Sequence, residues 1–234
     1  MAKKQDNYAT TSDFTGGAFA NWGYNFIVRF VSLITLGIAY PWMFCMKKRW
    51  ECAHTFIDGK QLAFDGKGGQ LIGNLIKWCL LTIITFGIYY ILKGRILMIE
   101  WETKHTHYAD GTQVESNPSH FDGKWYQIIG VRWLTTFVSI ITIGIGSFWA
   151  HCYTERWYAK HTQYDGDRLC FDGKALQYFG VRIKWLLLTI ITLGIYSFWM
   201  AVKTKQWTIK HTHVAVPAAA APAAPAEEAA PTAE

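Results

Sequence analysis

An internal repeat of about fifty residues constrains this chain more than any other feature. Phenylalanine, glycine and threonine recur at the same offsets in four copies, and a tryptophan followed by a His-Thr pair closes every copy. The openings are Phe14-Thr15-Gly16, Phe64-Asp65-Gly66, Phe121-Asp122-Gly123 and Phe171-Asp172-Gly173, and the closing tryptophans are Trp50, Trp101, Trp157 and Trp207. Such copies predict a repeat protein that uses one local structure four times.

The repeats form two duplicated pairs. Phe14 and Phe121 are 107 residues apart, and the same spacing separates Phe64 from Phe171. The domain boundaries that we predict are a polar segment at 1–13, a first half at 14–112 (repeats 14–63 and 64–112), a linker at 113–120, a second half at 121–213 (repeats 121–170 and 171–213) and a tail at 214–234. The tail consists mostly of Ala, Pro and Glu and is expected to be disordered because such a composition cannot bury a core.

Each repeat contains an apolar run that is interrupted at a Thr-x-Gly-Ile motif and flanked by positive charge. The runs occupy residues 30–46, 78–92, 133–150 and 185–202, which is 15 to 18 residues each. This length is close to that of a membrane-spanning helix. We therefore predict a mainly α, integral membrane protein of four helix–Gly break–helix units.

Short β-hairpins are expected between the helical units. Asp58-Gly59 and Asp165-Gly166 each lie between runs of β-favouring residues, and Asp-Gly at that place is typical of a type I′ turn. Asp65, Asp122 and Asp172 precede the helical segments and are interpreted as helix N-caps.

Two arrangements in the bilayer are compatible with this pattern. In the first, each apolar run crosses the membrane as one helix. In the second, each run breaks at its glycine into a helical hairpin whose tip lies in the membrane, so that both basic ends remain on one side as the positive-inside rule favours. Pro41 supports a break in the first repeat, since proline suits the first turn of a new helix.

Composition agrees with a membrane setting. The chain has 12 Trp residues, which favour membrane–water interfaces, and a formal charge of +6, which attracts anionic lipids. Long apolar runs argue against a nucleic-acid-binding protein. The mean hydropathy of +0.07 keeps a soluble helical repeat protein as the alternative. The five cysteines contain no C-x-x-C motif and indicate neither a disulfide framework nor a zinc site.

The chain resembles the YjgN-like family of bacterial inner-membrane proteins, whose function is unknown. The likeness rests on the Phe-x-Gly openings and on runs such as residues 188–196, Leu-Thr-Ile-Ile-Thr-Leu-Gly-Ile-Tyr, with Trp199 three residues later. It departs at residues 89–92, which lack the Trp, and at Gly146, which replaces the Tyr. The resemblance implies a multi-pass protein of the bacterial inner (plasma) membrane and supplies no activity.

Two sets of residues are candidate functional sites. The helix breaks are candidates for a polar pathway near the repeat axis, because hydroxyls and a broken backbone offer oxygens at membrane depth, although helix packing through small residues explains them equally well. The members are Thr35, Gly37, Thr85, Gly87, Thr142, Gly144, Thr192 and Gly194. Basic residues after the runs are candidates for binding lipid headgroups. These are Lys47, Lys48, Arg49, Lys203 and Lys205.

Other chemistry has weaker support. The repeated histidines His54, His105, His161 and His211 are interpreted as helix ends or strand starts rather than metal ligands, since no acidic or Cys ligand accompanies them at suitable spacing. No phosphate-binding loop, nucleophile elbow or H-E-x-x-H motif is present. We expect no metal and no cofactor, and an enzyme is a third, less favoured interpretation.

The predicted function is that of a multi-pass membrane protein acting as a transporter or channel component, with its pathway near the repeat axis. The alternative is a non-catalytic membrane scaffold or anionic-lipid interaction module. The expected partners are the lipid bilayer, anionic lipids and further copies of the chain.

Overall fold

The computed structural model describes residues 11–111 and 118–215. Within these ranges the chain forms eight helices and eight short strands. The helices are α1 (Ala18–Ile34), α2 (Tyr40–Ala53), α3 (Gly68–Ile84), α4 (Ile88–Lys104), α5 (Trp125–Ile141), α6 (Ser147–His161), α7 (Ala175–Ile191) and α8 (Ser197–Lys210). The strands are β1 (Asp13–Phe14), β2 (Thr55–Ile57), β3 (Lys60–Phe64), β4 (Thr106–Tyr108), β5 (His120–Phe121), β6 (Thr162–Tyr164), β7 (Asp167–Phe171) and β8 (Thr212–Val214).

Every repeat is a helical hairpin that is closed at its base by a pair of strands. The opening phenylalanine lies opposite the threonine of the closing His-Thr pair in all four copies. The registers are Phe14 with Thr55, Phe64 with Thr106, Phe121 with Thr162 and Phe171 with Thr212. The two ends of the sequence repeat are therefore neighbours in space, which explains why these residue types recur at both ends.

Glycine allows the base of each hairpin to pack tightly. A Cβ atom placed on Gly66 would overlap the ring of Phe64 and lie 2.8 Å from the ring of Trp101, and the other three repeats have the same crowding. The phenylalanines at these positions are buried. The Phe-x-Gly and Trp elements of the repeat thus form one packed unit.

The strands form two four-stranded antiparallel sheets with the orders β1-β2-β3-β4 and β5-β6-β7-β8. As predicted, the connections β2–β3 and β6–β7 are Asp-Gly turns, with positive φ at Asp58 (47°), Gly59 (82°), Asp165 (46°) and Gly166 (92°). The two turns also join the halves of the chain. The Asp58 carboxylate accepts the backbone N–H of Val214, and that of Asp165 accepts the N–H of Tyr108, each at 2.7 Å.

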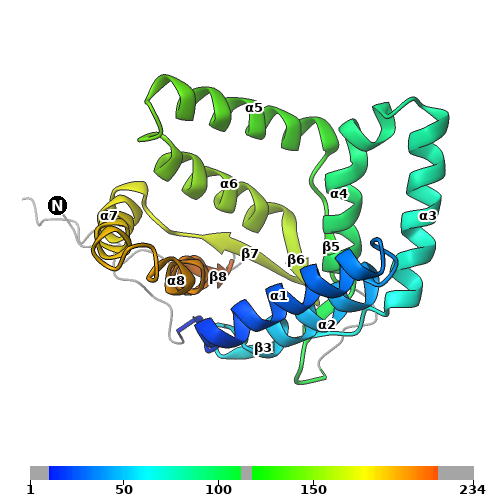
Figure 1. Ribbon diagram of the computed structural model, residues 1–234, viewed down its shortest axis with the longest axis horizontal. Helices are drawn as coiled ribbons and strands as arrows, with labels where there is room; N and C mark the ends of the chain where they lie inside the picture. Colours follow the sequence, from blue (N-terminus) through cyan, green and yellow to red (C-terminus); the bar gives the residue numbers. More distant parts are fainter. Residues whose placement is uncertain (1–10, 112–117, 216–234) are drawn as a thin grey trace, which may run out of the picture.

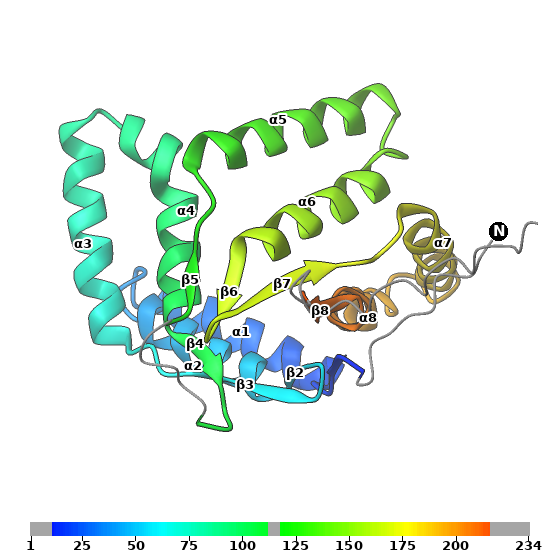
Figure 2. The same ribbon diagram turned by 180° about the vertical axis from the view of Figure 1, so that it is seen from behind.

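The four hairpins form a closed ring around the sheets. Consecutive hairpins pack through α2–α3, α4–α5 and α6–α7, and α8 returns to contact α1. Figure 1 shows α3 and α4 rising to one side and α5 and α6 running to another, and Figure 2 shows the same arrangement from behind. The helices extend outward while the strands lie near the centre.

The predicted fold class is confirmed as a mainly α protein with four helix–Gly break–helix repeats and short β-hairpins. All four breaks fall at the Thr-x-Gly-Ile motif, as the second arrangement predicted. In the part of the chain that is described, no helix combines the length and apolar character needed to cross a membrane. The first ten residues, most of the predicted linker and almost all of the predicted disordered tail lie outside the described residues.

The prediction that Asp65, Asp122 and Asp172 cap helices is wrong. The N-cap positions of α3, α5 and α7 are Lys67, Lys124 and Lys174, two residues further on. The physical reason is that the residue after each phenylalanine still belongs to the base of the hairpin. Its backbone N–H donates to the carbonyl of the closing histidine, for example from Asp172 to His211 at 3.0 Å.

Candidate functional site

The four hairpin tips combine two features that are unfavourable in water. Each places a large apolar residue in the left-handed backbone region, with φ between 49° and 51°. The residues are Leu36, Phe86, Ile143 and Leu193, whose exposed fractions are 91%, 96%, 94% and 94%. Left-handed backbone is strained for such side chains, above all for β-branched Ile143. Because backbone strain and an exposed apolar side chain recur together at all four tips, we infer that the four tips share one function.

The backbone of each tip satisfies its own hydrogen bonds. In the first hairpin, every N–H from Thr35 to Tyr40 donates to an acceptor within residues 31–37. The Gly37 N–H reaches back to the Ser32 carbonyl at 2.6 Å, and the Leu36 N–H to the Leu33 carbonyl at 3.2 Å, which is the Schellman pattern of a helix end. The same bonds recur at the third and fourth tips, and at the second tip for the N–H groups of residues 85–89. These turns therefore leave no N–H that requires water.

The predicted threonines are the central element of these bonds. The Thr192 hydroxyl donates to the Leu188 carbonyl at 2.7 Å and accepts the Tyr196 N–H at 3.0 Å, and Thr35, Thr85 and Thr142 do the same. The predicted glycines, Gly37, Gly87, Gly144 and Gly194, have φ between 86° and 91° and nothing within 4 Å of the place of a Cβ.

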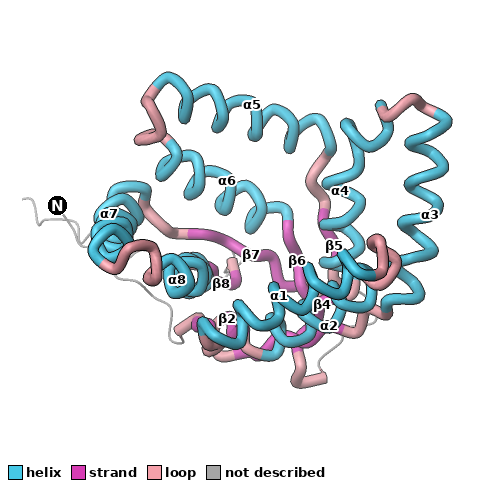
Figure 3. The backbone as a smooth tube through the Cα atoms, in the orientation of Figure 1, coloured by secondary structure: helices cyan, strands magenta, loops and turns pink. Residues whose placement is uncertain are grey.

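The structure therefore places the predicted pathway residues at the outer ends of the hairpins, in the loops drawn in pink in Figure 3. It does not bring the four breaks together around the sheets. Each threonine hydroxyl already donates one hydrogen bond and accepts another within its own tip, which leaves it little capacity to bind a solute. A pathway at these residues stays a prediction.

The first helix of each hairpin extends the apolar surface from the tip towards the base. Exposed side chains of this kind include Phe30, Leu33, Leu80, Ile83, Phe137, Ile140, Leu187 and Ile190. The only charges in α1, α3, α5 and α7 are positive: Arg29, Lys77, Arg132, Arg182 and Lys184, without a single Asp or Glu in these four helices. A surface that is apolar and exclusively cationic is complementary to an anionic lipid layer.

Four of the five predicted headgroup-binding residues are engaged inside the protein. Lys48 pairs with Glu102 at 2.7 Å, Lys205 with Glu51 at 2.6 Å, and Lys47 with Asn25 at 2.6 Å. The fourth, Arg49, donates to the Gly66 carbonyl at 2.9 Å. Lys203, in contrast, is exposed. Its headgroup role stays a prediction.

The inner ion pairs connect helices from different repeats. Burial disfavours the Lys48 ammonium, but Glu102 outweighs this effect and holds the pKa of Lys48 above its ordinary value. Burial likewise opposes ionisation of Glu51, yet Lys205 lowers the pKa of that carboxyl below its usual range. Sequence reasoning missed Glu51 and Glu102. A signal was present in the sequence, because each of these glutamates directly follows the closing tryptophan of its repeat, close to the basic residues that follow the apolar run.

Glu155 in α6 has a different environment. Burial raises the pKa of Glu155 to about 7. Its neighbour His151 lies 3.8 Å away, but burial, assisted by Arg182, lowers the pKa of His151 to about 4. The imidazole is therefore neutral when the carboxylate ionises, and the two groups do not form a charged pair at neutral pH.

The repeated histidines are architectural, as interpreted from the sequence. The Nδ1–H groups of His54, His105 and His211 donate to the carbonyl four residues earlier at 2.8 Å, and their rings lie on the closing tryptophans. Within the described ranges, no three His, Cys, Asp or Glu side chains are grouped so as to hold a metal ion.

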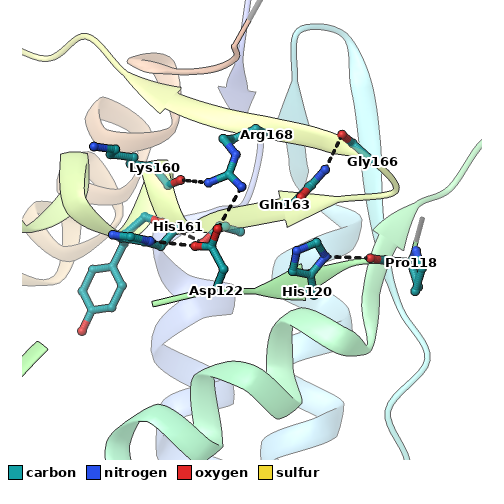
Figure 4. A network of polar contacts seen from close by, with 10 residues as sticks. Pro118, His120, Asp122, Lys160, His161, Gln163, Gly166 and Arg168 are labelled. Atoms are coloured by element: carbon teal, nitrogen blue, oxygen red, sulfur yellow. Dashed lines mark hydrogen bonds and ion pairs between the residues drawn. The ribbon is translucent and has the colours of Figure 1, made fainter. Parts of the chain in front are cut away.

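The third repeat uses its histidine differently. His161 contacts the Asp122 carboxylate at 2.7 Å, and Arg168 contacts the same carboxylate at 2.8 Å (Figure 4). Partial burial alone would raise the pKa of Asp122, but these two hydrogen bonds hold it below its ordinary value. Asp122 therefore joins β5 to α6 and β7, and it is not a free acid or base.

Comparison with known families gives one match. Residues 167–218 match the model of a family described as "Bacterial protein of unknown function (DUF898)". The matched segment begins at β7 and includes α7, α8 and β8, so it covers the fourth helical hairpin and its base. This finding supports a bacterial family domain over that segment and indicates no activity. No named relative connects the chain to the YjgN-like family, because neither curated proteins nor solved structures show a significant match.

Proposed function

We propose that this chain is a membrane-interface protein that inserts its hairpin tips into one leaflet of an anionic bilayer. The observation that carries the proposal is the chemistry of the tips. Four equivalent turns expose a large apolar side chain by more than 90% while their own acceptors satisfy their N–H groups. An unsatisfied backbone group costs several kcal/mol in lipid, and these turns avoid that cost for their N–H groups.

The positions of the charges are compatible with insertion to about one leaflet. Between six and twelve residues separate each tip glycine from the nearest Lys or Arg on either leg, as with the exposed Lys184 and Lys203 around Gly194. At the helical rise this corresponds to roughly 9–18 Å, whereas half of a hydrocarbon core is about 15 Å. The cations would then lie at the level of the phosphates, and both legs would return to the same side.

Anionic lipid is the favoured surface because cations are the only charges on the first helix of every hairpin. Exposed examples are Arg29, Lys77, Arg132 and Lys184. Each cation near such a surface contributes about 1 kcal/mol. The structure offers no corresponding support for a transporter or channel, and the membrane-interface module is the function that its geometry favours.

Replacing the tip residues tests this function. The variant carries Leu36→Asn, Phe86→Asn, Ile143→Asn and Leu193→Asn. Asparagine tolerates left-handed backbone, so the fold is retained, while each tip loses about 2 kcal/mol of apolar transfer. Co-flotation of the purified full chain with phosphatidylglycerol-containing liposomes should fall by about 100-fold or more.

The matched control is Leu176→Asn. Leu176 is 81% exposed but lies at the beginning of α7, away from the tip. This variant should float like the natural chain. Equal flotation of the four-tip variant and the natural chain would contradict the proposal. So would a natural chain that remains monomeric and folded in buffer without detergent.

A further inference from the structure

An apolar cavity lies at the second hairpin and has further walls from the first and third hairpins. It has a volume of about 720 Å³ and is lined by residues of α2, α3, α4 and α5. Tyr40 comes from the first hairpin, Trp78 and Gly94 from the second, and Arg132 from the third. This volume is in the range of known small-molecule sites.

Two features of the cavity wall point to a ligand with both an apolar part and a negative charge. Much of the wall is apolar, including Leu75, Ile83 and Met98. Arg95 and Arg132 also line it, while none of the described lining residues is acidic. Neither arginine has an ion-pair partner in the described part of the chain. An anion bound in the cavity would supply the missing partner of either guanidinium group.

Most residues that line this cavity belong to the second repeat. Gly94 is the single glycine inside the second helix of any hairpin, all four of which are described. The repeat also has Tyr89 and Tyr90, which both line the cavity, in the segment that lacks the repeated Trp. The sequence thus departs from its own repeat at the place where the structure has a cavity.

We propose that this cavity binds one anionic phospholipid, with an acyl chain along the apolar wall and the phosphate between Arg95 and Arg132. This inference rests on the proposed function, because insertion of the tips brings the cavity to the lipid. Arg95 is eight residues beyond the tip glycine Gly87, which is roughly 12 Å along a helix and near the level of the phosphates. Arginine guanidinium groups suit phosphate because their donors match its oxygens in pairs.

Cys79 provides a direct report on occupancy. It lines the cavity and is exposed, whereas Cys45, Cys52 and Cys152 are buried and Cys170 is partly buried. The full chain in a non-ionic detergent is treated with a maleimide while dioctanoyl phosphatidylglycerol is titrated below its micelle concentration. Labelling at Cys79, located by peptide mass spectrometry, should slow at least five-fold.

Three further probes separate the sources of the effect. Dioctanoyl phosphatidylcholine tests for a neutral headgroup, glycerol phosphate for a headgroup without chains, and inorganic phosphate for the anion alone. All three should protect Cys79 much less than phosphatidylglycerol. Equal protection by phosphatidylcholine or by inorganic phosphate would overturn the assignment of an anionic phospholipid.

The double variant Arg95→Gln and Arg132→Gln should abolish most of the protection. The matched control is Lys184→Gln, which removes an exposed cation of the fourth hairpin outside the cavity. Protection that survives in the double variant would overturn the site. Liposome flotation separates the two proposals. If Cys79 is not protected in a chain that still floats, the lipid site in the cavity is refuted while membrane insertion of the tips is not. The flotation test of the four-tip variant leaves both arginines unchanged and therefore tests insertion independently of the cavity.

Discussion

The two ends of each hairpin follow opposite rules, although they belong to the same repeat. At the base, a Cβ on Gly173 would overlap the Phe171 ring and lie 2.8 Å from Trp207. At the tip, nothing lies within 4 Å of a Cβ on Gly194, and the adjacent Leu193 is 94% exposed. The base is complementary to protein, and the tip has no protein partner. One repeat therefore contains an end that packs against protein and an end that exposes a large apolar side chain.

The largest change in stability is expected when the glycines at the two ends of a hairpin are replaced by alanine. Gly173→Ala should destabilise the protein by about 2–3 kcal/mol, because the methyl group must displace packed rings. Gly194→Ala at φ 91° should cost only about 1 kcal/mol of backbone strain. Thermal or denaturant unfolding in a mild detergent measures both. If the tip variant were as unstable as the base variant, the claim that only the base is packed against protein would be wrong.

A pH-dependent effect of intermediate size comes from Glu155, which lies between the two ends. The pKa of this carboxyl is raised to about 7 in the folded state from an ordinary value near 4.5. A raised pKa favours the folded state below pH 4.5, and this stability is lost as the pH rises through 7. Glu155→Gln should therefore change little at pH 4.

At pH 8 the same variant should be more stable than the natural chain by on the order of 1 kcal/mol, after allowance for the partial exposure of the carboxylate. The measurement is the midpoint of unfolding at both pH values. Lys160→Gln, at an exposed position of the same helix, serves as a control for a general charge effect. A Glu155→Gln variant that is destabilised at pH 8 would show that the carboxylate has an ionic partner.

The smallest effect on stability is expected for Leu193→Asn alone. Asparagine accepts left-handed backbone, and the exposed leucine contributes little to the core, so unfolding should change by less than about 0.5 kcal/mol. Membrane partition should nevertheless fall by roughly ten-fold or more. A marked loss of stability would mean that Leu193 packs against protein, contrary to its role as an exposed tip residue.

Much of the fold was predictable because its signals are local. The helix breaks at Thr-x-Gly-Ile and the turns at Asp58-Gly59 and Asp165-Gly166 depend on hydrogen bonds and φ values within a few residues. The N-caps were mispredicted because Asp65, Asp122 and Asp172 look like caps when the pairing of each hairpin base is unknown. The cavity was not predictable, since it requires the packing of four helices.

The repeat and the break in every apolar run follow from the sequence alone, whereas the pairing of each opening phenylalanine with the threonine of its His-Thr pair is visible only in the folded chain. The pairing of the charges likewise depends on how distant parts of the chain pack together. Lys203 and Lys205 are two residues apart on one helix, yet Lys205 pairs with Glu51 at 2.6 Å whereas Lys203 is exposed. The reason is that Glu51 is 154 residues away along the chain and reaches Lys205 only when the ring of hairpins closes.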